Sequence, residues 1–184
     1  MVMKINANTP MQFMLIGSSA EREDVFAPSQ AEYGSFYEAF GECFSAWADI
    51  EGNLFSIYIF LLKSKEYDAV AASFYSTAGF KAKLDLVDAV VKNSQFISSN
   101  DLKSWLKLSE KISKKSKNRN QIAHQTIFYG RFNKNSVRKM FVAHPRTPGK
   151  GAKLYLHDLI QIRGSFIEGS KELSNFWLKL VDKK

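Results

Sequence analysis

The fold of this chain is decided by residues 36–62, FYEAFGECFSAWADIEGNLFSIYIFLL, the longest periodic stretch in the sequence. Large apolar residues recur here at steps of three and four, from Phe36 through Phe44 and Leu54 to Leu61. Residues three and four apart lie on the same side of an α-helix, so this spacing is the pattern of one helix face. The stretch therefore predicts a long amphipathic helix at the centre of a helical protein.

Shorter periodic stretches follow the long one and predict the rest of a helical bundle. We expect further helices to begin near Ser64, after Gly79 and near Asp101, and a closing helix to begin at Asp158. Each of these positions carries a capping or helix-breaking residue next to the point where the apolar period begins. The predicted fold class is mainly α, a bundle of about four to five helices.

One segment before the last helix has the composition of β-structure. Residues 126–129 and 137–142 are β-branched and aromatic, and residues 130–136 between them include turn formers. Two such runs on either side of a turn predict a β-hairpin. We expect this hairpin to form a small β-excursion at about 125–156, inserted before the last helix of the bundle.

The domain organisation follows from where the periodic pattern begins. Residues 1–33 are polar and are predicted to form an N-terminal extension that is partly flexible or packed on the body. At most, residues 12–16 of this extension form a short strand. Residues 34–184 are predicted to form a single helical domain that includes the β-excursion. We find no internal repeat in the chain.

Two further features bear on the compartment. The longest apolar run, Leu54–Leu62, is about half of the ~20 residues that a membrane-spanning helix needs, so no membrane partner is expected. The single cysteine, Cys43, cannot form an internal disulfide, which fits a reducing compartment. We therefore expect a cytoplasmic protein.

Charge is distributed unevenly along the chain, whose formal net charge is +8 at pH 7. Residues 1–100 hold 7 basic and 12 acidic residues, whereas residues 101–184 hold 19 basic and 6 acidic residues. No acidic residue occurs between Glu110 and Asp158. Charge this one-sided attracts a polyanion and indicates a nucleic acid as partner. The alternative for this segment is a solvated helix face followed by a basic loop.

One short motif in the basic half carries the candidate chemistry: Arg119-Asn120-Gln121-Ile122-Ala123-His124. The apolar period of its helix places Arg119 where a core residue is expected, and a guanidinium is rarely found there without a partner. Glu51, on the stripe of the long helix, is the predicted supporting partner; a solvated Glu51 is the alternative. Asn120 and His124 share a helix face, whereas Arg119 and His124 converge only if the helix loosens near His124 or the arginine side chain reaches round the helix.

The spelling Arg-Asn-x3-His resembles the signature of the HEPN (higher eukaryotes and prokaryotes nucleotide-binding) superfamily, and the Ile-Ala-His ending is typical of its bacterial members. The resemblance covers roughly residues 36–181 and implies a small helical bundle that acts as a metal-independent ribonuclease, as a toxin, an antiphage effector or an RNA-processing domain. It also implies a homodimer in which both copies of the motif face one cleft. An antitoxin or neighbouring regulatory protein is a further expected partner. Gln125 departs from the family, in which many members have glycine there.

The expected function is cleavage of RNA through its own 2′-hydroxyl, with no cofactor and no metal. His124 is the expected proton acceptor, Arg119 the phosphate-binding cation, and Asn120 an orienting residue for His124 or the phosphate. The alternative is a non-catalytic HEPN-like module that binds RNA or a protein through the same surface. The expected RNA-binding residues are basic side chains of the motif's helix and the hairpin: Lys114, Lys115, Lys117, Arg131, Lys134, Arg138 and Lys139.

Several other residue types that can carry chemistry have structural explanations. Tyr129 and Phe132 lie between basic residues and are candidates for stacking on nucleic-acid bases. His144 lies beside a proline loop and His157 beside a helix cap, so both read as structural or solvent-exposed, and neither has the spacing of a zinc ligand. The expected core residues are the three tryptophans and the cysteine, Trp47, Trp105, Trp177 and Cys43.

Overall fold

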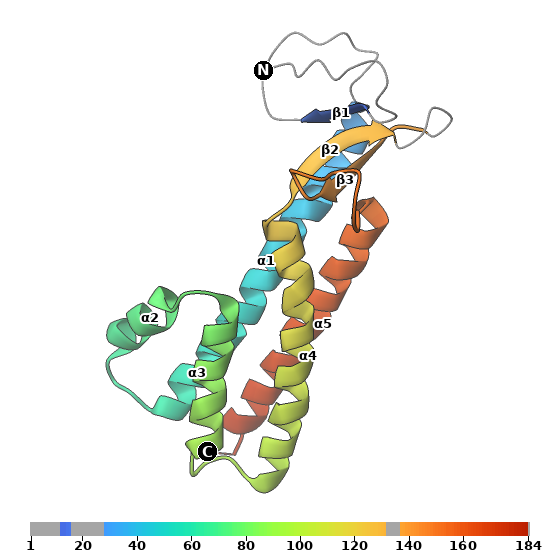
Figure 1. Cartoon of the computed structure of the whole chain (residues 1–184). Helices are drawn as coiled ribbons and strands as arrows, with labels where there is room; N and C mark the ends of the chain where they lie inside the picture. The colour runs from blue at the N-terminus through green and yellow to red at the C-terminus, as the bar shows by residue number, and fades with distance from the viewer. Residues whose placement is uncertain (1–11, 16–27, 132–136, 184) are drawn as a thin grey trace. The chain divides into compact units, whose positions relative to one another are not determined.

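The computed structural model describes residues 12–15, 28–131 and 137–183 (Figure 1). In chain order its elements are β1 (Gln12–Leu15), α1 (Gln30–Leu62), α2 (Tyr67–Ser76), α3 (Phe80–Asn93), α4 (Ser99–Ala123), β2 (Thr126–Arg131), β3 (Lys139–Ala143) and α5 (Leu156–Val181). The predicted mainly α fold class is confirmed, with a hairpin before the last helix. Among the described helices, none has both the length and the apolar character that crossing a membrane requires.

The chain forms two compact units, and the unit boundaries fall inside three of the helices. The first unit comprises Met1–Glu42 and Asn120–Gln161, and the second comprises Cys43–Arg119 and Ile162–Lys184. The strands β1, β2 and β3 all belong to the first unit. The described residues of the second unit contain helices and their connections, but no strand.

The second unit is a helical bundle built on the apolar stripe of α1. Ile50 and Leu54 of α1 are fully buried. Trp47 packs against Phe80 of α3 and Phe166 of α5, with ring centroids 4.5 and 5.0 Å apart. Burying a large apolar side chain contributes about 1.5–3 kcal/mol, so this stripe supplies much of the free energy that holds α1, α3 and α5 together.

The buried stripe of α1 runs through Cys43 instead of Phe44. Cys43 is 1% exposed, as expected for a core residue, whereas Phe44 is 37% exposed. The expectation that Phe44 lies on the stripe is therefore wrong. Neighbouring residues differ by only about 100° around a helix axis, so two adjacent apolar residues fit the same period and the packing of the neighbouring helices decides between them.

The first unit contains an antiparallel sheet with the strand order β1-β2-β3. Its register pairs Thr126 with Ala143 and Phe128 with Phe141, and the two phenylalanine rings stack 5.7 Å apart. Tyr155 packs against this cluster from the segment before α5. Both the predicted hairpin and the predicted short N-terminal strand, which is β1, are confirmed.

The outer edge of β3 is closed by groups from outside the hairpin. The backbone N–H of Met140 donates to Glu32 Oε1 of α1 at 3.3 Å. Val142 and Leu154 exchange backbone hydrogen bonds of 2.8 and 3.0 Å. An open strand edge invites pairing with another chain, and these contacts occupy that edge. A further partner of the hairpin would therefore bind to one of its faces and not to this edge.

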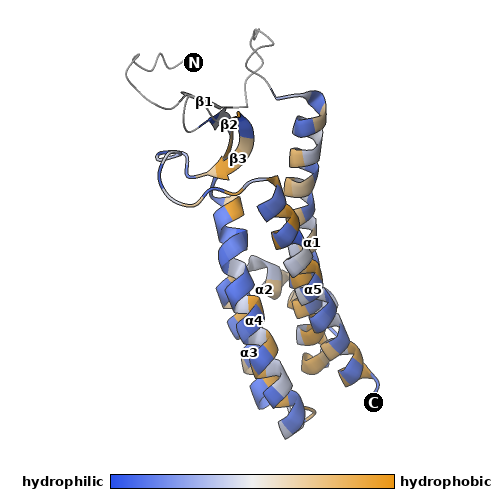
Figure 2. Cartoon of the chain, turned by 90° about the vertical axis from the view of Figure 1, so that its right-hand side faces the viewer, coloured by the Kyte–Doolittle hydropathy of each residue, from blue (hydrophilic) through white to orange (hydrophobic). Residues whose placement is uncertain are grey.

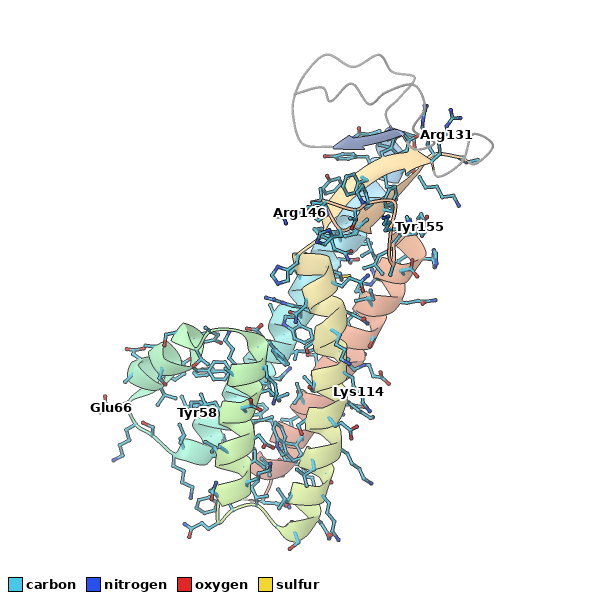
Figure 3. The ribbon with its side chains drawn as sticks, in the orientation of Figure 1. Tyr58, Glu66, Lys114, Arg131, Arg146 and Tyr155 are labelled. Atoms are coloured by element: carbon cyan, nitrogen blue, oxygen red, sulfur yellow. The ribbon has the colours of Figure 1, made fainter. Side chains whose placement is uncertain are left out.

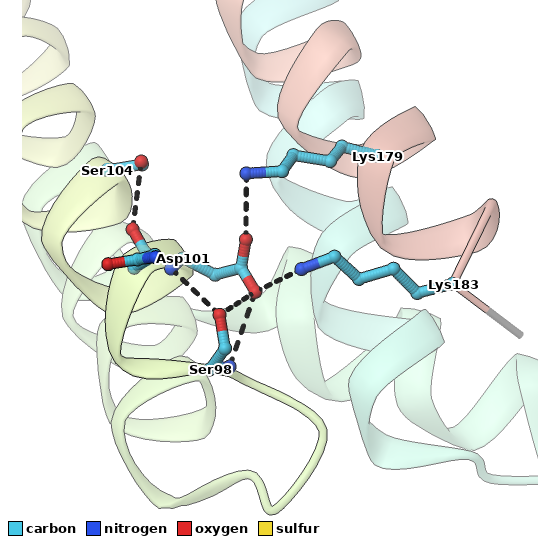
Figure 4. Close-up of polar contacts among 6 residues, drawn as sticks. Ser98, Asp101, Ser104, Lys179 and Lys183 are labelled. Carbon is cyan, nitrogen blue, oxygen red and sulfur yellow. Dashed lines mark hydrogen bonds and ion pairs between the residues drawn. The ribbon is translucent and has the colours of Figure 1, made fainter.

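A buried carboxylate joins the start of α4 to the end of α5 within the second unit (Figure 4). Asp101 is fully buried, and its carboxylate binds Lys183 and lies 3.0 Å from Nζ of Lys179. The backbone N–H groups of Asp101 and Ser98 donate reciprocally to each other's side chains at 3.2 and 3.3 Å, which is a capping box. Asp101 thus caps one helix and anchors another.

The starts of α2, α3 and α5 agree only in part with the sequence predictions. The helix α5 begins at Leu156, two residues before the predicted start. Asp158 lies in its first turn, and the carboxylate accepts a hydrogen bond from Tyr155 N–H at 2.8 Å. Gly79 precedes α3 with φ of 77°, a conformation that favours glycine. Ser64 is not the N-cap of α2, because its hydroxyl accepts from Glu66 N–H two residues on and the helix begins at Tyr67.

Candidate functional site

The predicted motif occupies the C-terminal end of α4. The backbone N–H of His124 donates to the carbonyl of Asn120 at 3.1 Å, after which the chain leaves the helix and enters β2. Arg119 is half-buried and belongs to the second unit, whereas Asn120 and His124 are exposed and belong to the first. The helix ends at Ala123, and the His124 N–H closes its last helical hydrogen bond.

One face of the hairpin combines an aromatic side chain with cations. Tyr129 pairs with Met140 across the ladder. Because alternate strand residues share a face, Arg131 and Arg138 lie on the side of Tyr129, and Lys139 lies on the other side. Figure 3 shows Arg131 at the C-terminal end of β2. We call Tyr129, Arg131 and Arg138 the Tyr129 face.

Electrostatic interactions tie this face to the start of α1. Burial raises the pKa of Tyr129, the carboxylate of Glu32 raises it further, and the Arg138 guanidinium lowers it. The phenol ring therefore lies within the field of both charged groups. Phe132 and Lys134, which the sequence indicated for stacking and for RNA binding, lie outside the described residues.

The three lysines of α4 that are predicted to bind RNA differ in their exposure and in their contacts. Lys114 is largely exposed and pairs with Glu110 at 2.7 Å, one turn away (Figure 3). Lys115 is only 14% exposed, and its ammonium donates to Ser165 Oγ of α5 at 2.6 Å. Lys117 is exposed, and it pairs with no carboxylate in the described part of the chain. Lys115 therefore serves the packing of α4 on α5, and Lys114 and Lys117 are the accessible cations.

Sequence reasoning missed two exposed lysines on the same helix. Lys103 and Lys107 precede Lys111 and Lys114 at steps of four, four and three, so all four share one face of α4. Figure 2 shows that α4 is largely hydrophilic along its length. Helical spacing alone was the available signal, but these two residues lie before the acid-free segment that begins at Lys111.

Glu51 lies among aromatic residues of the second unit. Its Oε1 accepts from Trp47 Nε1 at 2.9 Å and its Oε2 accepts from Lys83 Nζ at 2.6 Å. The Lys83 ammonium also lies over the Phe74 ring, 5.7 Å from its centroid. The predicted pair of Glu51 with Arg119 is not among these contacts: the cation on this carboxylate comes from α3. Glu51 thus has a structural partner of its own.

We expect Lys83→Met to lower the free energy of unfolding by about 3 kcal/mol, because it leaves a largely buried carboxylate without its cation. The Glu51 and Lys83 side chains are only 17% and 13% exposed. Glu51→Gln should cost a similar amount, and the double variant should cost much less than the sum. Chemical denaturation of the four proteins measures this coupling.

The matched control for this cycle is the Lys81–Asp85 pair on the same helix. Its side chains are 73% and 56% exposed, so we expect the losses from Lys81→Ala and Asp85→Ala to add. Additive losses at Glu51 and Lys83 as well would contradict the assignment of that pair as a stabilising one.

The tryptophans and the histidines lie largely where the sequence placed them. Trp47 and Trp105 are buried core residues, and Trp177 is half-buried. All three histidines, His124, His144 and His157, are exposed and belong to the first unit. The exposure expected for the last two is confirmed.

Within the described ranges, no three His, Cys, Asp or Glu side chains gather closely enough to hold a metal ion. No protein-family model, curated protein sequence or solved structure matches this chain.

Proposed function

We propose that this chain is a metal-independent endoribonuclease of the HEPN type. The observation that carries the proposal is the placement of His124, which is exposed where α4 ends and belongs to the same unit as the Tyr129 face. An imidazole can accept a proton near neutral pH. A surface of arginines and a tyrosine ring suits RNA, because it offers cations for phosphates and a ring for stacking.

The proposed reaction uses the nucleophile that RNA itself carries. His124 accepts the proton of the ribose 2′-hydroxyl, the 2′-oxygen bonds to phosphorus, and the bond from phosphorus to the 5′-oxygen breaks. Arg119 binds the phosphate and stabilises the charge that develops on its oxygens, and Asn120 orients His124 or the phosphate. The products are a 2′,3′-cyclic phosphate and a 5′-hydroxyl.

The proposed partners follow from the same resemblance. RNA is the substrate, and a homodimer would place a second copy of His124 where it can protonate the leaving 5′-oxygen. A toxin or antiphage effector of this kind acts in the cytoplasm and is held in check by an antitoxin or a neighbouring regulatory protein. Sedimentation of the purified chain measures the dimer directly.

A non-catalytic module is the second candidate, and a specific observation favours it. The Tyr129 face of the first unit and the exposed Lys114 and Lys117 of the second unit each offer cations to a polyanion, and neither group needs His124 for this. Such a module would bind RNA, or an acidic protein, and leave it intact. The two candidates therefore differ in whether bound RNA is cut, which one experiment decides.

That experiment is incubation of the purified chain with total RNA in excess EDTA. We expect cleavage to persist under chelation, because the proposed reaction needs only side chains and the 2′-hydroxyl. The products should carry cyclic phosphate and 5′-hydroxyl ends, and a 2′-deoxy substrate should stay intact. Binding without cleavage would establish the non-catalytic module, and cleavage of the 2′-deoxy substrate would overturn the proposed mechanism.

Binding of RNA should depend strongly on salt, because contacts to phosphates release counterions, with a slope of about −0.7 per contact for single strands. Measured on the His124→Ala protein, the slope should flatten by up to about 3 when four hairpin cations are replaced, since each contact accounts for ~0.7. The four substitutions to alanine are at Arg131, Lys134, Arg138 and Lys139.

The matched control is Lys171→Ala, which removes an exposed lysine from α5. This change should leave the salt slope nearly as it was, and both variants should affect all RNA sequences alike, because phosphate contacts do not read bases. An unchanged slope in the fourfold variant would instead mean that the hairpin cations are solvated and that RNA binds elsewhere.

A further inference from the structure

The register of the hairpin brings a second histidine to the end of the sheet at which His124 lies. The ladder between β2 and β3 ends at the pair of Thr126 with Ala143. His124 lies two residues before this pair, and His144 lies one residue after it. Since paired Cα atoms are about 5.5 Å apart at most and consecutive ones 3.8 Å, the two histidine Cα atoms lie within about 17 Å.

The views of the ribbon agree with this placement. In Figures 1 and 2 the loop that follows β3 lies beside the point where α4 passes into β2. Arg146 in this loop lies near that junction in Figure 3, at the opposite end of the hairpin from Arg131. His124 and His144 are both exposed, so both imidazoles are accessible at this end of the first unit.

A tight turn fixes the imidazole of His144. The carbonyl of His144 accepts from Thr147 N–H at 3.2 Å, and Pro145 occupies the second position, where proline suits a turn. Within the turn, His144 Nδ1 accepts from Arg146 N–H at 3.3 Å and lies 3.4 Å from Thr147 Oγ1. A protonated Nδ1 cannot accept from the Arg146 N–H, so the imidazolium form gives up that bond, and its Nδ1–H can donate to the Thr147 hydroxyl instead. These contacts engage Nδ1 and leave Nε2 for another partner.

We propose that His144 is the general acid of the same chain's active site. This inference rests on the proposed ribonuclease function and replaces the second copy of His124 as the proton donor. His124 takes the 2′-hydroxyl proton as the 2′-oxygen bonds to phosphorus, and imidazolium His144 gives its Nε2 proton to the 5′-oxygen as that bond breaks. His124 gains one proton and His144 loses one, and exchange with water restores both.

The test combines one substitution with two substrates. His144→Asn keeps an acceptor for the N–H two residues on, as asparagine does in turns, but removes the proton donor. On ordinary RNA we expect cleavage to fall by about 10²-fold or more. On RNA with sulfur in place of the scissile 5′-oxygen, the variant should cleave at nearly the wild-type rate, because a thiol has a pKa of about 8.5 and leaves without protonation. His124→Ala should be impaired on both substrates.

The matched control is His157→Gln, which alters another exposed histidine of the same unit and should leave both rates unchanged. If His144→Asn cleaves ordinary RNA at the wild-type rate, or loses cleavage of both substrates equally, His144 is not the acid. If wild-type protein cleaves neither substrate, the ribonuclease proposal itself fails, which distinguishes the two failures.

Mixing the His124→Ala and His144→Asn proteins tests whether His144 protonates the leaving group within its own chain or in a partner chain. When both histidines act in one chain, no mixture contains an intact site, so we expect no recovered activity. Recovery of cleavage on mixing would show that His144 acts on the partner's substrate and would overturn the assignment to one chain.

Discussion

His124→Ala should lower the rate constant for RNA cleavage by about 10²–10⁴-fold, which is the usual contribution of a positioned general base. His124 is exposed, so the substitution should change the free energy of unfolding by no more than about 0.5 kcal/mol. Arg119→Ala should lower the rate by about 10²–10³-fold, as the loss of a charge-stabilising donor does. Single-turnover cleavage of saturating RNA measures both changes.

Two comparisons separate chemistry from folding in this experiment. Arg119→Lys keeps a cation on α4 but cannot bind two phosphate oxygens side by side, so it should stay well below the wild-type rate. Thermal unfolding by circular dichroism should show each variant folded. Wild-type cleavage in the His124→Ala protein would remove this histidine from the mechanism.

Asp101→Ala should lower the free energy of unfolding by about 3 kcal/mol, because it breaks a buried ion pair and a helix cap at once. The substitution removes a buried carboxylate that binds Lys179 and Lys183 and caps α4. Asp101→Asn should cost less, because the amide can still cap the helix. Urea denaturation at pH 7 measures these losses.

The same carboxylate makes stability depend on pH. Burial alone would raise the pKa of Asp101, but hydrogen bonds from Lys183, Ser98 and Lys179 outweigh burial and hold the pKa well below its ordinary value of 3.8. A depressed folded-state pKa stabilises the protein above the unfolded-state value and loses that contribution as the pH falls. Wild-type stability should therefore drop below about pH 5, since the unfolded carboxyl begins to bind protons there.

Asp101→Asn provides the comparison for this pH dependence. The variant should lose less stability than the wild type as the pH falls from 5 toward 3. Asp85→Asn alters an exposed carboxylate in an ion pair and should keep the wild-type slope. Equal slopes in the wild type and in Asp101→Asn would show that other carboxylates cause the acid sensitivity.

Local patterns were enough to predict which segments form helices and strands. The apolar period of residues 36–62 predicts α1 because a helix must bury one face, whatever lies against it. The β-branched runs around the turn at 130–136 predict the hairpin for the same kind of local reason. Periodicity could not decide which of two neighbouring apolar residues faces the core. The sequence placed Phe44 on the buried side of α1, whereas the structure buries Cys43 there.

The motif at Arg119–His124 and the acid-free basic segment could also be read directly from the chain, because residue type and spacing along one helix are properties of the sequence alone. The partners of individual charges could not. Glu51 meets Lys83 of α3, and Lys115 meets Ser165 of α5. Both contacts join residues far apart in the chain, and only the packing of the bundle determines which helix face meets which.

By itself, the sequence therefore determined the mainly α fold class, the hairpin before the last helix and the position of the candidate motif. Only the tertiary structure decided that the half-buried Lys115 packs α4 on α5 and that His144 lies at the same end of the hairpin as His124. The physical reason is that the period of a strand or helix depends on neighbouring residues alone. Strand register and helix packing, in contrast, bring together residues that lie far apart in the chain.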